Sequence, residues 1–327
     1  MPSRFQVVTC LSNPFSFNSR NILYERFVDH MTNTGADLTV VELIYDDRIT
    51  RADKREDRIW ELRQEQRELK LNFIPLRTRD VLWHKEQLIN IAFESLPDDW
   101  KYAVWADADI HFANPMWAKE TIAALNHYDI VQPWSHAIDL CPRYAPVPNT
   151  KIATSFMYGW RNSLPSKTGR YDDWNHHPGY AWGIRREAYE ELGGLLDTAI
   201  LGAGDRHMAM GLVGKAALSY PSQVSDGYKA SVLAWQNLAD RYIAGNVGYV
   251  DGLITHGWHG SKKKRRYHDR WKILIEHQFD PVTDLRIDRG QDIWRWADDR
   301  GDRMRGLRDD VRGYFSARDE DSGPDWE

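Results

Sequence analysis

The sequence predicts an α/β protein with a central, mostly parallel sheet flanked by helices. An apolar, β-rich run at Phe5 to Leu11 is followed by helical spacing from Ile22 to Met31 and by a second apolar run at Leu38 to Tyr45. This strand–helix–strand opening is typical of parallel sheets with right-handed crossovers. A helix at Val81 to Ser95 then precedes another apolar strand at Tyr102 to Ala106.

The rest of the chain is patterned less regularly. The charged stretch 46–70 is predicted as a solvated loop or helical excursion, and 135–176 as a mobile loop over the site. A charged, helical extension is predicted at 289–327, and its residues from Ala317 onward are predicted to be disordered. The further elements that the pattern predicts are strands at 71–74, 129–133 and near 250, and helices at 121–125, 185–192 (closed by Gly193 and Gly194) and 206–212.

Composition is that of a globular protein with a real core. The 327 residues are 42% hydrophobic and 28% charged, and the net charge of −5 gives no global indication of nucleic-acid binding. The fifteen Trp and fifteen Tyr provide flat faces that suit sugar rings and bases, although burial in the core is the alternative. With two cysteines, no signal-peptide pattern and no apolar run that could span a bilayer, we expect a cytoplasmic protein without a membrane partner.

Two carboxylates, Asp107 and Asp109, directly follow the predicted strand at Tyr102 to Ala106. Ligands of parallel α/β sheets bind outside the carboxyl ends of the strands. Where the strand turns out, both carboxylates can converge on one hard cation, such as Mg²⁺ or Mn²⁺, which would neutralise a diphosphate. Two idle surface acids are the alternative.

A second pair of candidate ligands, His256 and His259, follows the predicted strand near residue 250. Two imidazoles at this spacing can reach one metal if the backbone turns, and they favour Mn²⁺ over Mg²⁺. The basic run from Lys262 to Arg266 could contact a diphosphate or a polyanionic acceptor such as nucleic acid, or could be a solvated loop.

A third candidate is the run from Gly202 to Asp205. Its glycines allow the backbone to approach a ligand closely, and Asp205 opens a predicted helix. We interpret Asp205 as the general base that deprotonates an acceptor hydroxyl, while a plain helix cap is the alternative.

Together these residues resemble the GT-A glycosyltransferases, and most closely the β-1,4-galactosyltransferase-like branch, in scattered motifs over residues 5–275. Arg20, in the loop from Asn13 to Asn21, matches an arginine that contacts the nucleotide. Trp83 and Lys85 match an aromatic and a basic residue placed for the uridine. Asp107-Ala108-Asp109 looks like the DxD signature that binds metal and donor.

The second half carries the more specific match. Gly179 to Tyr189, followed by Gly193-Gly194, resembles the family's glycine-rich strand, helix and turn. Gly202 to Asp205 falls at the family's GGED run, with Gly204 in place of the first acid, and His256 and His259 fit the spacing of two late metal ligands. The chain also looks like glycosyltransferases of phages and bacteria that share HxWHG and GAGD elements.

The resemblance implies a GT-A, Rossmann-like fold in one catalytic domain at 1–288, with a nucleotide-binding half at 1–133 and an acceptor and catalytic half at 134–288. It implies inverting transfer from a nucleotide sugar, with a UDP-sugar expected, to a glycan or a hydroxymethylated DNA base. A metal-dependent nucleotidyltransferase or phosphohydrolase, or a non-catalytic carbohydrate- or nucleic-acid-binding module, is the alternative. The residues implied are a base (Asp205), metal ligands for Mn²⁺ or Mg²⁺ (Asp107, Asp109, His256, His259), donor contacts (Arg20, Trp83, Lys85, Asp107, Asp109, Gly179, Lys262) and acceptor contacts (Tyr180, Trp182, Gly204).

Overall fold

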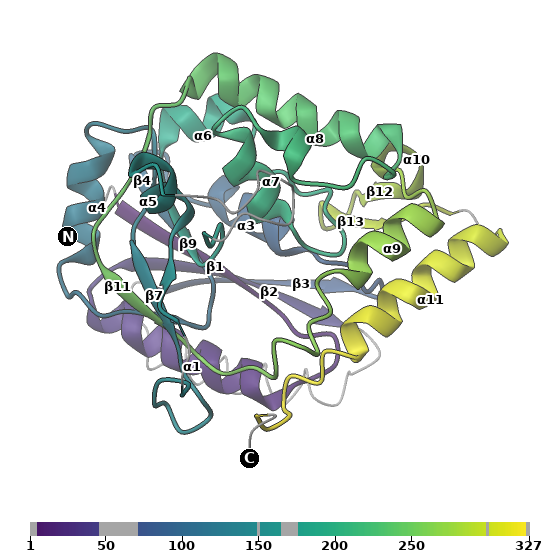
Figure 1. Ribbon diagram of the computed structural model, residues 1–327, viewed down its shortest axis with the longest axis horizontal. Coiled ribbons are helices and arrows are strands. Elements are labelled where there is room, and N and C mark those ends of the chain that lie inside the picture. The colour runs from purple at the N-terminus through teal and green to yellow at the C-terminus, as the bar shows by residue number, and fades with distance from the viewer. Residues whose placement is uncertain (1–4, 46–70, 149–150, 165–175, 299–300, 325–327) are drawn as a thin grey trace.

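A seven-stranded sheet forms the centre of the computed structural model (Figure 1), which describes residues 5–45, 71–148, 151–164, 176–298 and 301–324. The predicted segment 46–70 therefore lies outside the described residues. In spatial order the strands are β10 (Val247–Tyr249), β6 (Ile130–Gln132), β9 (Ala181–Arg185), β4 (Tyr102–Ala106), β1 (Phe5–Ser12), β2 (Asp37–Tyr45) and β3 (Leu71–Thr78).

The sheet is mostly parallel, as the sequence predicts. The pairs β1–β2, β2–β3, β1–β4 and β6–β10 are parallel, whereas β9 runs antiparallel to both of its neighbours. From β1 the chain winds outward through β2 and β3, and from β4 it continues on the other side. Strands β1 and β4 therefore flank a topological switch point, which is the place where open α/β sheets bind ligands.

Helices cover both faces of this sheet, because successive strand residues point to opposite sides. Val7 belongs to the core that packs under α1 (Asn18–Asn33) and α4 (Trp117–Leu125). Its neighbour Val8 belongs to the core on the other face. The helices that cover this second face are α3 (Lys85–Glu94), α6 (Arg186–Leu192), α7 (Gly204–Gly211) and α8 (Asp226–Leu238).

A smaller four-stranded sheet lies beside the carboxyl end of β4. Its strands, in spatial order, are β5 (Ile110–Phe112), β11 (Leu253–His256), β7 (His136–Asp139) and β8 (Ala153–Thr154). Strand β11 is antiparallel to β5 and parallel to β7, so His256 lies opposite Ile110 on one side and Asp139 on the other. This pairing brings two distant parts of the chain to the end of β4.

The C-terminal part packs α9 (Asp269–Glu276) beside α11 (Asp302–Ser316), as Figure 1 shows. Between them, α10 (Pro281–Asp284) leads into a hairpin of β12 (Leu285–Asp288) and β13 (Ile293–Trp296). The other short elements are α5 (Phe156–Arg161), a 3₁₀ turn (Ala216–Leu218) and a π turn (Ala239–Ile243). Among the described residues, no helix has the length and apolar character needed to cross a membrane.

Most predicted elements are present with shifted ends. The helix predicted at 185–192 begins at Arg186 and ends at Gly193, whose φ of 66° is favourable for glycine. The region 135–176 is more regular than expected, since β7, β8 and α5 lie within its described part. The sequence pattern missed α8 altogether. Cys10 and Cys141 are both free.

The antiparallel strand β9 is the link between the two halves of the sheet, and its fully buried Ile184 pairs with both β4 and β6. We expect Ile184→Ala to lower the free energy of unfolding by about 2 to 5 kcal/mol, because it leaves a cavity in the core. Urea unfolding measures this, and Ile152→Ala, at a side chain that is 58% exposed, is the matched control. Equal loss in both variants would contradict the central position of β9.

Candidate active site

A pocket of about 210 Å³ opens at the switch point between β1 and β4. Its walls come from the end of β1, from the residues after β4, from the start of α3 and from the start of α7. The chain from Tyr314 to Glu320 closes a further side. The pocket thus lies where the topology predicts a ligand site, and residues from both ends of the sequence line it.

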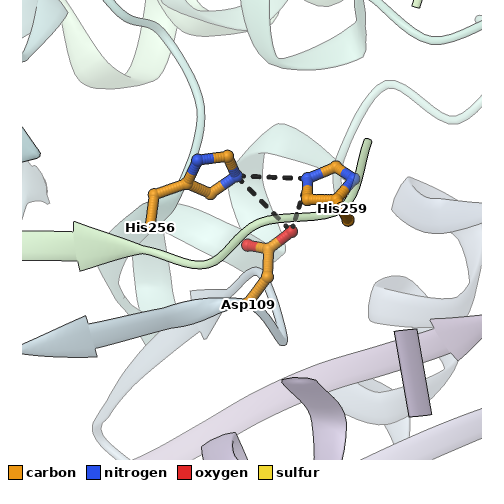
Figure 2. Close-up of side chains that lie close together, drawn as sticks. All are labelled: Asp109, His256 and His259. Carbon is orange, nitrogen blue, oxygen red and sulfur yellow. Dashed lines mark hydrogen bonds and ion pairs between the residues drawn. The ribbon is translucent and has the colours of Figure 1, made fainter. Parts of the chain in front are cut away.

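Asp109, His256 and His259 meet in this pocket (Figure 2). Asp109 Oδ2 lies 3.2 Å from His259 Nε2 and 3.7 Å from His256 Nε2, and the two Nε2 atoms are 3.2 Å apart. All three potential ligand atoms lie within 4.8 Å of one another. The sequence predicted that these three residues gather at one point, and the structure brings them together.

The local backbone explains this meeting. After β4 the chain turns, Asp107 N–H donates to Tyr180 O at 2.7 Å, and Asp109 leads directly into β5. Strand β11 pairs with β5 and ends at His256, and Gly257 N–H donates to Asp109 O at 2.8 Å. A Cβ at Gly257 would lie 2.2 Å from Leu23 Cδ2, so a side chain here would require Leu23 to move.

Each imidazole has a carboxylate at its other ring nitrogen. His256 Nδ1 lies 2.8 Å from Asp139 Oδ1, and His259 Nδ1 lies 3.6 Å from Glu320 Oε2. A proton on each Nδ1 directs both Nε2 atoms toward Asp109. Carboxylate partners of this kind fix the orientation and tautomer of metal-binding histidines. Neither Asp139 nor Glu320 was identified from the sequence.

The residues present fit a divalent cation. They offer one carboxylate oxygen and two imidazole nitrogens, and Asp109 Oδ1 is buried with no hydrogen-bond partner among the described residues. Two ring nitrogens 3.2 Å apart must share either a proton or a cation between them. Imidazole ligands favour Mn²⁺ over Mg²⁺. Asp107, which the sequence also predicted as a ligand, forms an ion pair with Lys85 instead.

In the metal-free protein, Asp109, His256 and His259 shift one another's pKa values. Burial alone would lower the pKa of His256, but Asp109 and Asp139 outweigh it and raise that pKa to about 9. Burial and the nearby Arg265 lower the pKa of His259. Although burial opposes ionisation of Asp109, the histidines hold its pKa well below the usual range. At neutral pH a proton on His256 Nε2 therefore occupies the space that a cation would take.

A second charged cluster, formed by Lys85, Glu86, Asp107 and Asp205, lines the same pocket. Burial raises the pKa of Glu86 to about 8, with Lys85 opposing and Asp205 adding to this effect. The carboxyl group of Glu86 faces Gly204, where a Cβ would lie 2.7 Å from Glu86 Oε1. An acid from α3 thus fills the space beside Asp205 in which a side chain at 204 would lie.

Asp205 lies in the first turn of α7 and lines the pocket. Its Oδ1 accepts a hydrogen bond from Arg206 N–H at 2.8 Å. A Cβ at Gly179 would lie 2.5 Å from Asp205 Oδ2, so this glycine makes room for the carboxylate. Gly179 and Gly204, predicted as donor and acceptor contacts, are placed beside the two acids Asp205 and Glu86.

The two aromatic residues predicted as acceptor contacts, Tyr180 and Trp182, lie in different places. Tyr180 lines the pocket, whereas Trp182 lies in the core, 3% exposed, where its ring stacks on Trp105. Residues two apart in a regular strand share a face. Tyr180 precedes β9 with a φ of +73°, an uncommon conformation for a tyrosine, and this turns the two rings to opposite faces.

The predicted donor contacts are also divided. Trp83, Lys85 and Arg20 line the pocket, with the Trp83 ring stacked on Phe315 and beneath the guanidinium of Arg318. Lys262 is 62% exposed and does not line the pocket. It pairs at 2.5 Å with Asp139, the carboxylate that contacts His256. The buried cation that the basic run contributes to the pocket is Arg265.

The C-terminal residues are not disordered where the structure describes them, up to Pro324. Glu320 is 1% exposed, and Arg20 binds it through two side-chain nitrogens. Lys264 pairs with Asp319, and Trp258 Nε1 donates to Ser322 O at 3.0 Å. The prediction of disorder fails because the charges of this segment have partners in distant parts of the chain.

Comparisons with known proteins give weak similarities. No protein-family model matches the sequence, and neither does any curated protein. Among solved structures, S. aureus TarS 1–349 is similar at 13% identity and a TM-score of 0.38 over 65% of this chain and 55% of that one.

A mutant of Drosophila β1,4-galactosyltransferase 7 in complex with manganese, UDP-Gal and xylobiose is similar at 15% identity and a TM-score of 0.31, over 66% of this chain and 63% of that one. A structure described as a nucleotide-diphospho-sugar transferase of Desulfovibrio desulfuricans G20 is similar at 13% identity and a TM-score of 0.33, over 95% and 96%. The chain thus matches less than two thirds of TarS and of the galactosyltransferase. TM-scores of 0.31 to 0.38 are too low to assign a function.

We expect Mn²⁺ affinity to rise with pH. The pKa of His256 is about 9 in the metal-free protein, so below that pH a cation must displace its proton. The apparent affinity should increase about tenfold per pH unit between pH 6.5 and 8, because one proton leaves per cation bound. Electron paramagnetic resonance of free Mn²⁺ measures this. An affinity that is flat over that range would exclude displacement of a proton from His256.

Asp139→Asn should lower the pKa of His256, because it removes one of the two carboxylates that raise it. Proton NMR of the His256 ring in metal-free protein measures the change. Asp251→Asn, at an exposed carboxyl group just before β11, is the control and should leave this pKa unaltered. An unchanged pKa in Asp139→Asn would show that the contact does not hold the ring.

Proposed function

We propose that this chain is a metal-dependent glycosyltransferase that moves a sugar from a nucleoside-diphosphate sugar to an acceptor hydroxyl with inversion. The observation that carries the proposal is the convergence of Asp109, His256 and His259 in a pocket at the switch point of the sheet. A UDP-sugar is the expected donor, as the sequence resemblance implies.

Binding of a diphosphate is supported by the charges around the pocket. A divalent cation bound by Asp109 and the two histidines would neutralise the diphosphate and act as a Lewis acid toward the leaving nucleoside diphosphate. Arg265 and Arg270 also line the pocket and can contact phosphate oxygens. Trp83 lines the pocket and contributes an aromatic wall beside which a base or sugar can bind. The pocket thus combines a cation site, arginines and an aromatic wall.

Asp205 is the proposed base. Its carboxylate lines the same pocket as the candidate metal ligands and accepts a hydrogen bond from its own helix. It would take the proton of the acceptor hydroxyl while that oxygen attacks the anomeric carbon. A single displacement inverts the anomeric configuration. Glu86, whose pKa is raised to about 8, stays protonated at neutral pH and is therefore the less suitable base of the two.

We propose a glycan acceptor in preference to a hydroxymethylated DNA base. Within the basic run, Lys262 pairs with Asp139 and Arg266 with Asp269. Lys264 pairs with Asp319, and Arg265 is buried. A surface that binds duplex DNA needs cations that can reach phosphates. Steep salt dependence of acceptor binding would instead favour DNA.

The test is a panel of nucleotide sugars with Mn²⁺, in which release of the nucleoside diphosphate and thermal stabilisation are measured. A cognate donor should stabilise the protein by mass action and release a nucleoside diphosphate. Release of pyrophosphate or a monophosphate would indicate nucleotidyl transfer or phosphate hydrolysis. Stabilisation without turnover would indicate a binding module, and indifference to every donor and to Mn²⁺ would exclude the proposal.

Two variants separate the roles of the acids. Asp109→Asn should abolish both Mn²⁺-dependent donor stabilisation and transfer, because it removes a metal ligand. Asp205→Asn should keep donor stabilisation while the transfer rate falls by about 10²- to 10⁴-fold, the usual contribution of a general base. Transfer at the wild-type rate in Asp205→Asn would remove this residue from the mechanism.

A further inference from the structure

The C-terminal tail, which we define as residues 318–322, packs beside the candidate metal site. Asp321 accepts hydrogen bonds from the backbone N–H groups of Asn18 and Ser19 at 2.8 and 2.7 Å, at the start of α1. The Ser19 hydroxyl donates to Glu320 O at 3.0 Å. In Figure 1 the chain after α11 runs back toward α1. The tail is therefore fixed to the N-terminal loop that lines the pocket.

Close packing fixes the path of the tail at Gly260. Gly260 has a φ of +84°, and a Cβ there would lie 2.9 Å from the Cα of Glu320 and 3.1 Å from the backbone oxygen of Asp319. A side chain at this position would push the tail away from the site. The glycine that ends the HxWHG element thus admits the tail directly beside His259.

Glu320 is held as a buried anion. Arg20 binds it through Nε and through Nη2, the latter at 2.7 Å from Oε1, and Arg318 Nε lies 2.8 Å from Oε1. The two guanidinium groups compensate the charge of this buried carboxylate. A carboxylate held by two arginines on a fixed backbone has little freedom to turn.

This anion faces the outer nitrogen of a candidate metal ligand. Glu320 Oε2 lies 3.6 Å from His259 Nδ1, a buried nitrogen without a hydrogen-bond partner in the described part of the chain. Attraction between them favours the tautomer with its proton on Nδ1, whereas Asp109 Oδ2, 3.2 Å from Nε2, favours the other tautomer, so Glu320 shifts the balance between the two. With the proton on Nδ1, the lone pair of Nε2 is free and directed at Asp109 and His256, where a cation would bind.

We propose that Glu320 is a positioning residue of the metal site and that the tail completes this site by orienting His259. The inference rests on the metal site of the proposed function, but it concerns a residue outside the predicted ligand set. It also gives a role to a tail whose charged sequence predicts disorder.

The experiment measures Mn²⁺ binding to donor-free protein by electron paramagnetic resonance. Glu320→Gln keeps the shape of the side chain and removes its charge, and we expect the dissociation constant to rise about 10- to 100-fold, the usual effect of losing such a partner. The matched control is Asp319→Asn, which removes a neighbouring, half-exposed charge that pairs with Lys264. This control should bind Mn²⁺ within about twofold of the wild type, because exposed ion pairs contribute little.

A second measurement needs no metal. Nitrogen-15 NMR of metal-free wild-type protein should report His259 with its proton on Nδ1, and Glu320→Gln should move part of the population to Nε2. If Glu320→Gln does not fold, Glu320→Asp retains the charge for the arginines but draws it back from His259. This variant should then show the weaker Mn²⁺ binding and the altered tautomer.

The outcomes are distinct. Wild-type affinity and tautomer in a folded Glu320→Gln would overturn the role of Glu320 and leave the proposed glycosyltransferase intact. Equal weakening in Asp319→Asn would overturn it too, because any disturbance of the tail would then suffice. A wild-type protein that binds no Mn²⁺ would refute the metal site and the proposed function together, and the tautomer measurement would still decide whether Glu320 holds His259.

Discussion

A buried row of two imidazoles between two carboxylates is the interaction on which the site depends. Asp139, His256, His259 and Glu320 follow one another at distances of 2.8, 3.2 and 3.6 Å, with Asp109 beside the central pair. Isolated buried charges are costly, so each member is tolerable only because the next one compensates it. The row connects the paired strands β7 and β11 to the C-terminal tail.

The pocket as a whole balances charge in a similar way. Lys85 neutralises Asp107, and Arg20 and Arg318 neutralise Glu320. Asp109 is compensated by the protonated His256. Asp109 and Glu320 are therefore kept ionised in a buried site, where their fields are strong, whereas burial raises the pKa of Asp107. A cation and a diphosphate entering together would add charges of opposite sign and leave this balance nearly undisturbed.

The sequence was sufficient for the parts of the molecule that local pattern determines. The opening strand–helix–strand unit, the apolar strand before Asp107 and the spacing of His256 and His259 led to the sheet and to the three residues that meet in it. Features set by contacts between distant residues were not accessible. Asp139 reaches His256 only through the pairing of β7 with β11, and Glu320 reaches Arg20 across 300 residues of sequence. The charged tail predicts disorder because its charges have no partners nearby in the sequence. Trp182 does not reach the pocket, because the unusual backbone of Tyr180 breaks the alternation of side chains along the strand.

The reversed direction of β9 has a consequence for how such a molecule can vary. In a fully parallel sheet, only the C-terminal ends of the strands face the ligand site, and all the N-terminal ends lie at the opposite edge of the sheet. Strand β9 is reversed, so the residues before its N-terminal end, Gly179 and Tyr180, lie on the side of Asp205. Its C-terminal end leads into α6, away from the pocket. Substitutions just before β9 can therefore change which ligands the pocket accepts without disturbing α6. At this point of the chain, ligand specificity can evolve independently of the packing of the fold.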